Sequence, residues 1–162
     1  MLRNGSPAPE FGLRSDDGAI VSLEEVGNGQ PLLLHFFRGA FCPTARRNLL
    51  NLQDVYGRIK SMGCGFAAIS ADAPRDLAAL RGKLDLDYPL LSDEGFVVSR
   101  TYGVYESEDG EGPQPHGEPA LFIVDVDGRI AYSQIMTGPK GLANPSEMAL
   151  VLLYMTLNGG RY

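Results

Sequence analysis

The chain has 162 residues, a hydrophobic share of 44%, a charged share of 21% and a formal net charge of −6. This length and composition predict a single globular domain over residues 1–162, with enough apolar residues for a core. An acidic chain without a basic run is a poor candidate for binding nucleic acid or an anionic membrane surface.

The N-terminal residues lack the pattern of a signal peptide, since Met1 to Gly5 lead into Pro and polar residues. The longest apolar run, 148–157, is too short to span a bilayer, so we expect no membrane partner. Two cysteines do not make a disulfide scaffold. These features together predict a cytoplasmic, reducing setting.

Taken in chain order, hydrophobic periodicity and turn residues predict a β-hairpin, a β-α-β-α-β-α series, a second hairpin and a final helix. The expected strands are 11–13, 20–23, 31–37, 64–70, 88–91, 119–125 and 130–136; the expected helices are 43–60, 74–84, 93–102 and 145–157. Alternating strands and helices predict a central sheet with helices on both faces. Sites in such sheets lie beyond the carboxyl ends of parallel strands.

The segment FFRGAFCPTARRNL, residues 36–49, carries the strongest chemical signal. Cys42 follows a buried strand and directly precedes Pro43, which suits the first position of a helix. Free backbone N–H groups and the helix dipole favour a thiolate there, and Arg38 and Arg46 add positive charge nearby. A thiolate is a nucleophile, so Cys42 is the candidate reactive residue. The alternative is a buried, inert cysteine.

The other candidate residues have plainer interpretations. Cys64 begins the strand after the first long helix, roughly 20 Å from Cys42 by strand geometry, which is beyond disulfide range and indicates a structural role. His35 on the buried strand is expected to be a core residue. The acidic loop 106–118 is expected to be a solvated insertion, with a substrate lid as the alternative. Its His116 is expected to be an ordinary loop histidine, with an approach to the thiol as the alternative. No spacing of metal ligands or of nucleotide-binding glycines is present, so neither a metal nor a cofactor is expected.

Seven segments together resemble the peroxiredoxin-like branch of the alkyl hydroperoxide reductase / thiol-specific antioxidant family. They are GSPAPEFGL (5–13), DDGAIVSL (16–23), LLLHFFRGAFCP (32–43), FAAISAD (66–72), YPLLSDEG (88–95), YGVY (102–105) and PALFIVDVDGRI (119–130). The resemblance implies a thioredoxin-like, three-layer α/β/α fold with a mixed central sheet and an N-terminal β-hairpin extension. It also implies a thiol-dependent peroxidase or antioxidant activity.

The catalytic positions depart from that family. Its site is Thr-x-x-Cys with an Arg on a later strand, and an ungapped match places Cys42, Ala45 and Pro119 at these three positions. All three differ towards thioredoxin, whose site is Cys-x-x-Cys with a cis-proline facing it. Cys42-Pro43-Thr44-Ala45 keeps the first cysteine and lacks the second. By resemblance, Pro119 is expected to follow a cis peptide bond.

These observations predict a monothiol redox protein. Cys42 would attack a peroxide or a disulfide, Arg38 and Arg46 would stabilise the developing charge, and an external thiol would restore the cysteine. Two alternatives stay open: a redox-inactive binding module, or a dithiol Cys-Pro-Thr-Cys oxidoreductase if Ala45 is an engineered substitution. The apolar helix 145–157 offers a surface for a homodimer.

Overall fold

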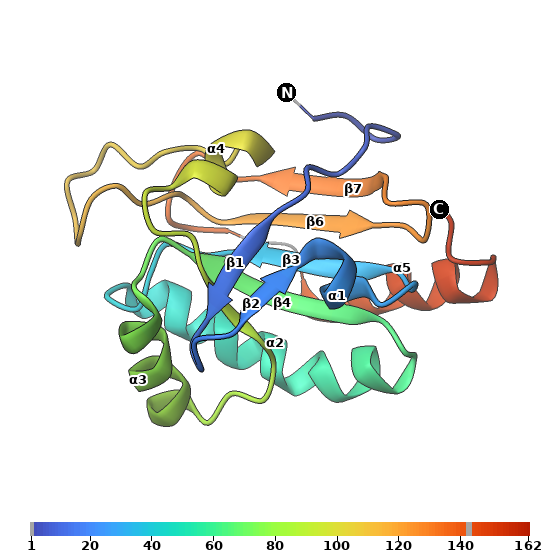
Figure 1. The fold of residues 1–162 in the computed structure, drawn as a ribbon, viewed down its shortest axis with the longest axis horizontal. Coiled ribbons are helices and arrows are strands. Elements are labelled where there is room, and N and C mark those ends of the chain that lie inside the picture. Colours follow the sequence, from blue (N-terminus) through green and yellow to red (C-terminus); the bar gives the residue numbers. More distant parts are fainter. Residues whose placement is uncertain (1, 142–143) are drawn as a thin grey trace.

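A computed structural model describes residues 2–141 and 144–162. Seven strands form a mixed sheet in the order β2-β1-β5-β4-β3-β6-β7 (Figure 1). The strands are β1 Gly12–Ser15, β2 Ile20–Ser22, β3 Leu32–Phe36, β4 Gly65–Ser70, β5 Leu90–Ser92, β6 Ala120–Val124 and β7 Ile130–Ile135. The helices are α1 Leu23–Gly27, α2 Pro43–Ser61, α3 Pro74–Leu84, α4 Val97–Tyr102 and α5 Pro145–Leu157.

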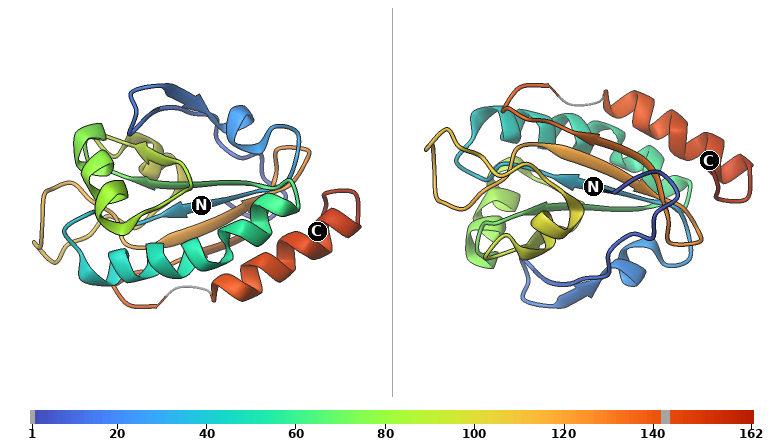
Figure 2. Two further views of the ribbon diagram at one scale, coloured as in Figure 1. Left: turned by 90° about the horizontal axis from the view of Figure 1, so that it is seen from below. Right: turned by 90° about the horizontal axis from the view of Figure 1, so that it is seen from above.

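Helices cover both faces of the sheet, which confirms the predicted three layers (Figure 2). Alternate residues of β3 enter different cores because successive strand side chains point to opposite faces. Leu33 packs with buried residues of α2, α3 and α5, and Leu34 packs with residues of α1, α4 and the N-terminal segment. The β1–β2 hairpin joins the sheet by antiparallel pairing of β1 with β5, as the predicted N-terminal extension.

Three neighbouring parallel strands define the edge of the sheet that matters for function. β3 pairs with β4 from Leu32↔Gly65 to Phe36↔Ile69, and β4 pairs with β5 in the same direction. The carboxyl ends of all three strands therefore meet at one edge. The loops that leave this edge carry Cys42, Asp72 and Asp93.

Two short helices differ from the sequence-based prediction. α1 was not expected, and its first residue, Leu23, was assigned to the strand over 20–23; Ser22 begins the helix with a capping box, in which Ser22 and Glu25 exchange side-chain-to-backbone hydrogen bonds. α4 was expected from residue 93 but begins at Val97, because Phe96 has a left-handed backbone with φ 64°. The Asp93 carboxylate instead accepts hydrogen bonds from the N–H groups of Val98 and Ser99.

The helix over residues 145–157 begins as predicted, with Asn144 as its cap and Pro145 at its first position. Across residues 2–141 and 144–162, none of the helices combines the length and the apolar character needed to cross a membrane.

Candidate functional site

Cys42 occupies the position that the sequence predicts, beyond the carboxyl end of β3 and at the N-cap of α2. Pro43 takes the first helical position, where its missing N–H leaves no hydrogen bond unmade. The thiol is buried, with 4% of the residue exposed. Among the described residues, no N–H of the helix start donates to the sulfur. The polar contact to Cys42 comes from a side chain instead.

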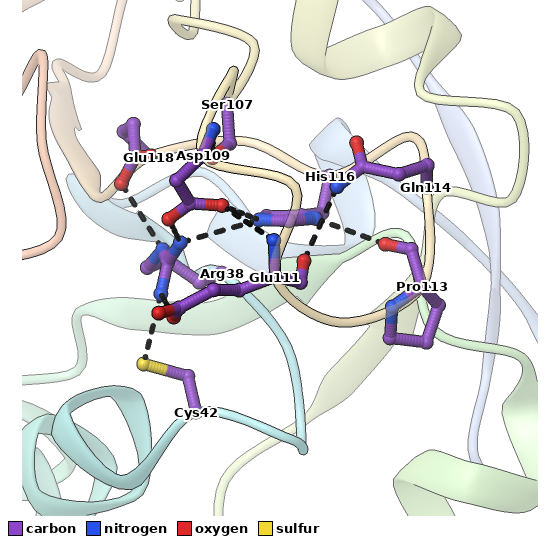
Figure 3. Close-up of polar contacts among 9 residues, drawn as sticks. All are labelled: Arg38, Cys42, Ser107, Asp109, Glu111, Pro113, Gln114, His116 and Glu118. Atoms are coloured by element: carbon purple, nitrogen blue, oxygen red, sulfur yellow. Dashed lines mark hydrogen bonds and ion pairs between the residues drawn. The ribbon is translucent and has the colours of Figure 1, made fainter.

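That side chain is Arg38, which is buried to 98% and lies at the centre of the site (Figure 3). Its Nη1 donates to Cys42 Sγ at 3.4 Å. Its Nε lies 3.1 Å from Glu118 Oε2, as an ion pair and not as an aligned hydrogen bond. Its Nη2 donates to Asp109 Oδ2 and approaches His116 Nε2 at 3.4 Å. Every nitrogen of the guanidinium therefore has a polar partner.

The acidic loop supplies most of these partners. Asp109 and His116 belong to loop 106–118, and Glu118 ends it two residues before β6. Glu118 and His116 are buried, whereas Asp109 is 30% exposed at its side chain and Glu111, 3.7 Å from Arg38 Nη1, is 70% exposed. The expectation of a solvated insertion therefore holds for the exposed residues 108–114 and is wrong for Ser107, His116 and Glu118, which are buried.

The orientation of His116 follows from its hydrogen bonds (Figure 3). Its Nδ1 lies 2.9 Å from the carbonyl oxygen of Pro113, which only accepts, so Nδ1 carries the hydrogen. In the neutral ring Nε2 is then an acceptor, as the N–H groups of Arg38 require. The ring of Phe41 packs edge-on against His116, with 4.9 Å between ring centroids, and Arg38 lies 5.4 Å from the Phe41 centroid.

The charges of the site stabilise one another. Burial disfavours the charged form of Arg38, but the hydrogen bond to Cys42 and the charges of Glu118, Cys42 and Asp109 together raise the pKa of Arg38. The backbone N–H of Glu111, and to a smaller degree the charge of Arg38, lower the pKa of Asp109. The guanidinium is thus a permanent positive charge fixed beside the thiol.

The remaining predicted site residues lie outside this network. Arg46 was expected to add positive charge near Cys42; its Nη1 donates to the carbonyl oxygen of Ala40 at 2.7 Å. Thr44 is exposed to solvent. Pro119 leads into β6 as predicted, but its peptide bond is trans, and a cis bond occurs earlier, at Gln114–Pro115. The Pro119 carbonyl accepts a hydrogen bond from Met136 N at 2.9 Å, which extends the pairing of β6 with β7 by one residue.

Cys64 and His35 lie where the sequence places them. Cys64 precedes β4 at the opposite end from the Cys42 loop; both cysteines are free, and burial raises the pKa of the Cys64 thiol. His35 is wholly buried on β3, where burial lowers its pKa to about 4. Across residues 2–141 and 144–162, no cluster of three or more His, Cys, Asp or Glu side chains is suited to hold a metal ion.

Three partners of Arg38, namely Asp109, His116 and Glu118, were not assigned this role from the sequence. They follow Arg38 by 71, 78 and 80 positions, and no local pattern links them to it. The available signal was indirect: a buried arginine after a core strand requires acidic partners, and loop 106–118 is the most acidic segment of the chain.

The fold and the site together place the chain in the class of thioredoxin-like α/β proteins, with a cysteine–arginine pair beyond the carboxyl ends of its parallel strands. Comparison with known proteins gives the family. The AhpC/TSA family matches residues 4–133. Peroxiredoxin Bcp of Escherichia coli K12 is 32% identical over 132 residues, which are 81% of this chain and 84% of that protein. The chain therefore belongs to the AhpC/TSA family and is peroxiredoxin-like.

Solved structures agree on the fold. Peroxidoxin BcpB from Mycobacterium tuberculosis superposes with a TM-score of 0.80 at 22% identity, covering 95% of this chain and 97% of that one. AhpC of Enterococcus faecalis superposes with a TM-score of 0.83 at 20% identity, covering 100% and 99% of the two chains. The thioredoxin-like fold class expected from the resemblance is confirmed.

Proposed function

We propose that this protein is a thiol-dependent peroxidase that uses Cys42 as its single nucleophile. The observation that carries the proposal is the buried pair of Arg38 Nη1 and Cys42 Sγ at 3.4 Å, since a fixed guanidinium stabilises a thiolate and the charge that develops on a peroxide oxygen. Membership of the AhpC/TSA family supports the same chemistry.

The oxidation step transfers two electrons from sulfur to the peroxide. The Cys42 thiolate attacks the terminal oxygen, an S–O bond forms, the O–O bond breaks, and the leaving alkoxide takes up a proton to become an alcohol. The cysteine becomes a sulfenic acid. Ala45 offers no second thiol and Cys64 lies at the other end of the strands, so the proposal requires an external thiol to restore Cys42. Attack on a disulfide substrate would use the same thiolate.

The test is mass spectrometry of the fully reduced protein after brief exposure to one equivalent of hydrogen peroxide. Wild type and Cys64→Ser are expected to gain one oxygen, and Cys42→Ser is expected to gain none on this time scale. A Cys42 that stays reduced in the folded protein contradicts the proposal.

The alternative is a binding module without redox turnover. The observation that favours it is the burial of Cys42, of which 4% is exposed, together with an Arg38 whose nitrogens are all occupied. A module of this kind predicts that Cys42 is as slow to react with peroxide and with iodoacetamide as Cys64. The same experiment, with both reagents, distinguishes the two functions.

A homodimer is the second part of the proposal. α5 leaves an apolar surface uncovered, on which Leu150 is 62% exposed, Leu153 41%, Tyr154 54% and Leu157 76%. Apolar surface of this kind on a helix is typical of a contact between proteins. Molar mass by light scattering at several concentrations tests this part.

A reducing, cytoplasmic setting is the third part of the proposal. The two free cysteines support it, and fractionation of cells that express the protein tests it.

A further inference from the structure

A cavity of about 430 Å³ lies beside the loop that carries the thiol. Ala40 and Phe41, the two residues before Cys42, line it together with Pro113 of the acidic loop. One face of α3 also lines it, with residues 76, 79, 80 and 83 at helical spacing. Asp72, from the loop after β4, completes the lining. The cavity thus occupies the crevice beyond the carboxyl ends of β3 and β4, where ligands bind in sheets of this kind.

The charges of the cavity are separated along α3. Asp72 and Asp76 lie at the amino end of this helix. Lys83 lies seven residues after Asp76, roughly 10 Å further along the helix axis. Asp72 is held in place by the N–H of Ala40 at 3.0 Å and the hydroxyl of Ser70 at 2.6 Å. Burial raises the pKa of Asp72, and the nearby charge of Asp76 adds to this effect. A cation placed between these two carboxylates would relieve their repulsion.

Phe41 connects the cavity to the residues around the thiol. Its ring lines the cavity and also packs against His116 and Arg38, while the next residue along the chain is Cys42. Ala79 and Leu80 add apolar surface on the α3 wall. The cavity, which is open to solvent along α3, therefore combines apolar surface with two carboxylates near the amino end of the helix and one ammonium group near its carboxyl end.

We propose that this cavity binds the external reductant, and that the reductant is a small thiol that carries a protonated amine, with a carboxylate at its far end where Lys83 can pair with it. The inference rests on the proposed function, because a protein with one reactive cysteine needs such a thiol. Asp72 and Asp76 receive the ammonium group, and the methylene groups lie against Phe41 and Leu80.

Two molecules of the thiol complete the reductive half of the cycle. The thiolate of the bound reductant attacks the sulfur of the Cys42 sulfenic acid; an S–S bond forms, the S–O bond breaks, and hydroxide leaves and is protonated to water. A second molecule of the thiol attacks the mixed disulfide, frees the Cys42 thiolate and leaves as the disulfide of the reductant. One peroxide and two thiols give one alcohol, one water and one disulfide.

The test uses three thiols of similar size and different charge: cysteamine, 2-mercaptoethanol and 3-mercaptopropionate. Cys42 is first oxidised with one equivalent of hydrogen peroxide, and the sulfenic acid is quantified by mass spectrometry. Each thiol is then added, and the rate of mixed-disulfide formation is measured in wild type and in Asp76→Asn. Taking the ratio of the two rates for the same thiol cancels its intrinsic reactivity.

Loss of one partly screened charge is expected to slow cysteamine about threefold to tenfold in Asp76→Asn. 2-Mercaptoethanol should change less than about twofold, and 3-mercaptopropionate should react faster, since the lost charge repels it. In Lys83→Gln the order of the three thiols should reverse: the reaction of 3-mercaptopropionate should slow most, because the variant lacks the ammonium group that pairs with its carboxylate. Glu24→Gln removes an exposed carboxylate on α1, beside the amino end of β4, and should leave all three ratios near one.

The outcomes separate the two proposals. Equal ratios for the three thiols in Asp76→Asn and Lys83→Gln would show that the cavity does not bind the reductant, while sulfenic acid formation in the first step would leave the peroxidase proposal intact. A wild-type protein that forms no sulfenic acid contradicts the proposed function itself, and the reductant proposal with it.

Discussion

Replacing Arg38 by Met tests the electrostatic reasoning most directly, because the substitution keeps most of the apolar stem and removes the guanidinium. Glu118, with 4% of its side chain exposed, then loses its partner in the interior. Removing one member of a buried ion pair costs about 3–5 kcal/mol of stability. We expect a loss near the lower end, since Asp109 and Glu111 are exposed enough to turn towards water.

The same substitution removes the hydrogen bond that Cys42 Sγ accepts at 3.4 Å. Hydrogen bonds to charged groups contribute about 1.5–3 kcal/mol, which corresponds to roughly 10-fold to 150-fold in rate if the bond is made to the thiolate and to the transition state. We expect oxidation of Cys42 by hydrogen peroxide to slow by that factor in Arg38→Met. Quenched-flow mass spectrometry measures the rate, and urea unfolding measures the stability.

Two further variants separate chemistry from folding. Arg38→Met/Glu118→Met replaces the buried pair by apolar side chains, so most of the stability should return while oxidation stays slow. Arg46→Met removes the other arginine of the motif, whose guanidinium binds the Ala40 carbonyl, and should change the oxidation rate less than about threefold. A folded Arg38→Met protein that oxidises at the wild-type rate would refute the assignment of Arg38.

Three other substitutions have defined outcomes. Burial lowers the pKa of His35 from its ordinary 6.5 to about 4, so the unfolded chain binds a proton at His35 before the folded protein does as the pH falls. The folded protein therefore loses about 3 kcal/mol of stability between pH 6.5 and pH 4. In His35→Leu, the decline in stability over this pH range, measured by urea unfolding, should be smaller by that amount. Ala45→Cys places a second thiol three residues after Cys42, within the range of a disulfide, so peroxide should remove two hydrogens from the protein by mass spectrometry where wild type gains one oxygen. Leu157→Glu adds a charge where the side chain is 76% exposed, so light scattering should find a folded monomer if α5 forms the dimer contact. An unchanged pH dependence, a stable sulfenic acid or an unchanged mass would contradict the respective prediction.

Hydrophobic periodicity and helix-capping residues predicted most of the helices and strands, because each of these patterns lies within or next to the element that it predicts. The helix over residues 74–84 begins at Pro74 and ends at Leu84 as expected, and α2 extends one residue further than expected. α4 was misplaced because its start depends on the left-handed backbone of Phe96, which hydrophobic spacing does not encode. α1 was missed although its capping box is visible in Ser22-Leu-Glu-Glu25, since a helix of five residues has no measurable period.

The position of Cys42 followed from topology, but the set of side chains around it did not. A site that is built from one loop after β3 and another before β6 combines residues more than 70 positions apart, and their meeting depends on the antiparallel pairing of β3 with β6. Sequence reasoning therefore chose Arg46, one turn along the same helix, as readily as Arg38. The structure separates the two by their acceptors: a backbone carbonyl for Arg46, and the thiol for Arg38.

The contacts of Arg38 also indicate which part of the site yields to a substrate. Cys42 is 4% exposed and the guanidinium is fully engaged, so a peroxide reaches both groups by displacing an existing partner. Glu118 is buried next to the start of β6, and moving it would disturb the sheet. Asp109 and Glu111 lie on loop 106–118 with 30% and 70% of their side chains exposed, so water can replace Arg38 as their partner more readily than for Glu118. We therefore expect loop 106–118 to move when a substrate enters the site. Glu118 then remains the fixed partner of Arg38, and Asp109 and Glu111 are the partners that the substrate displaces.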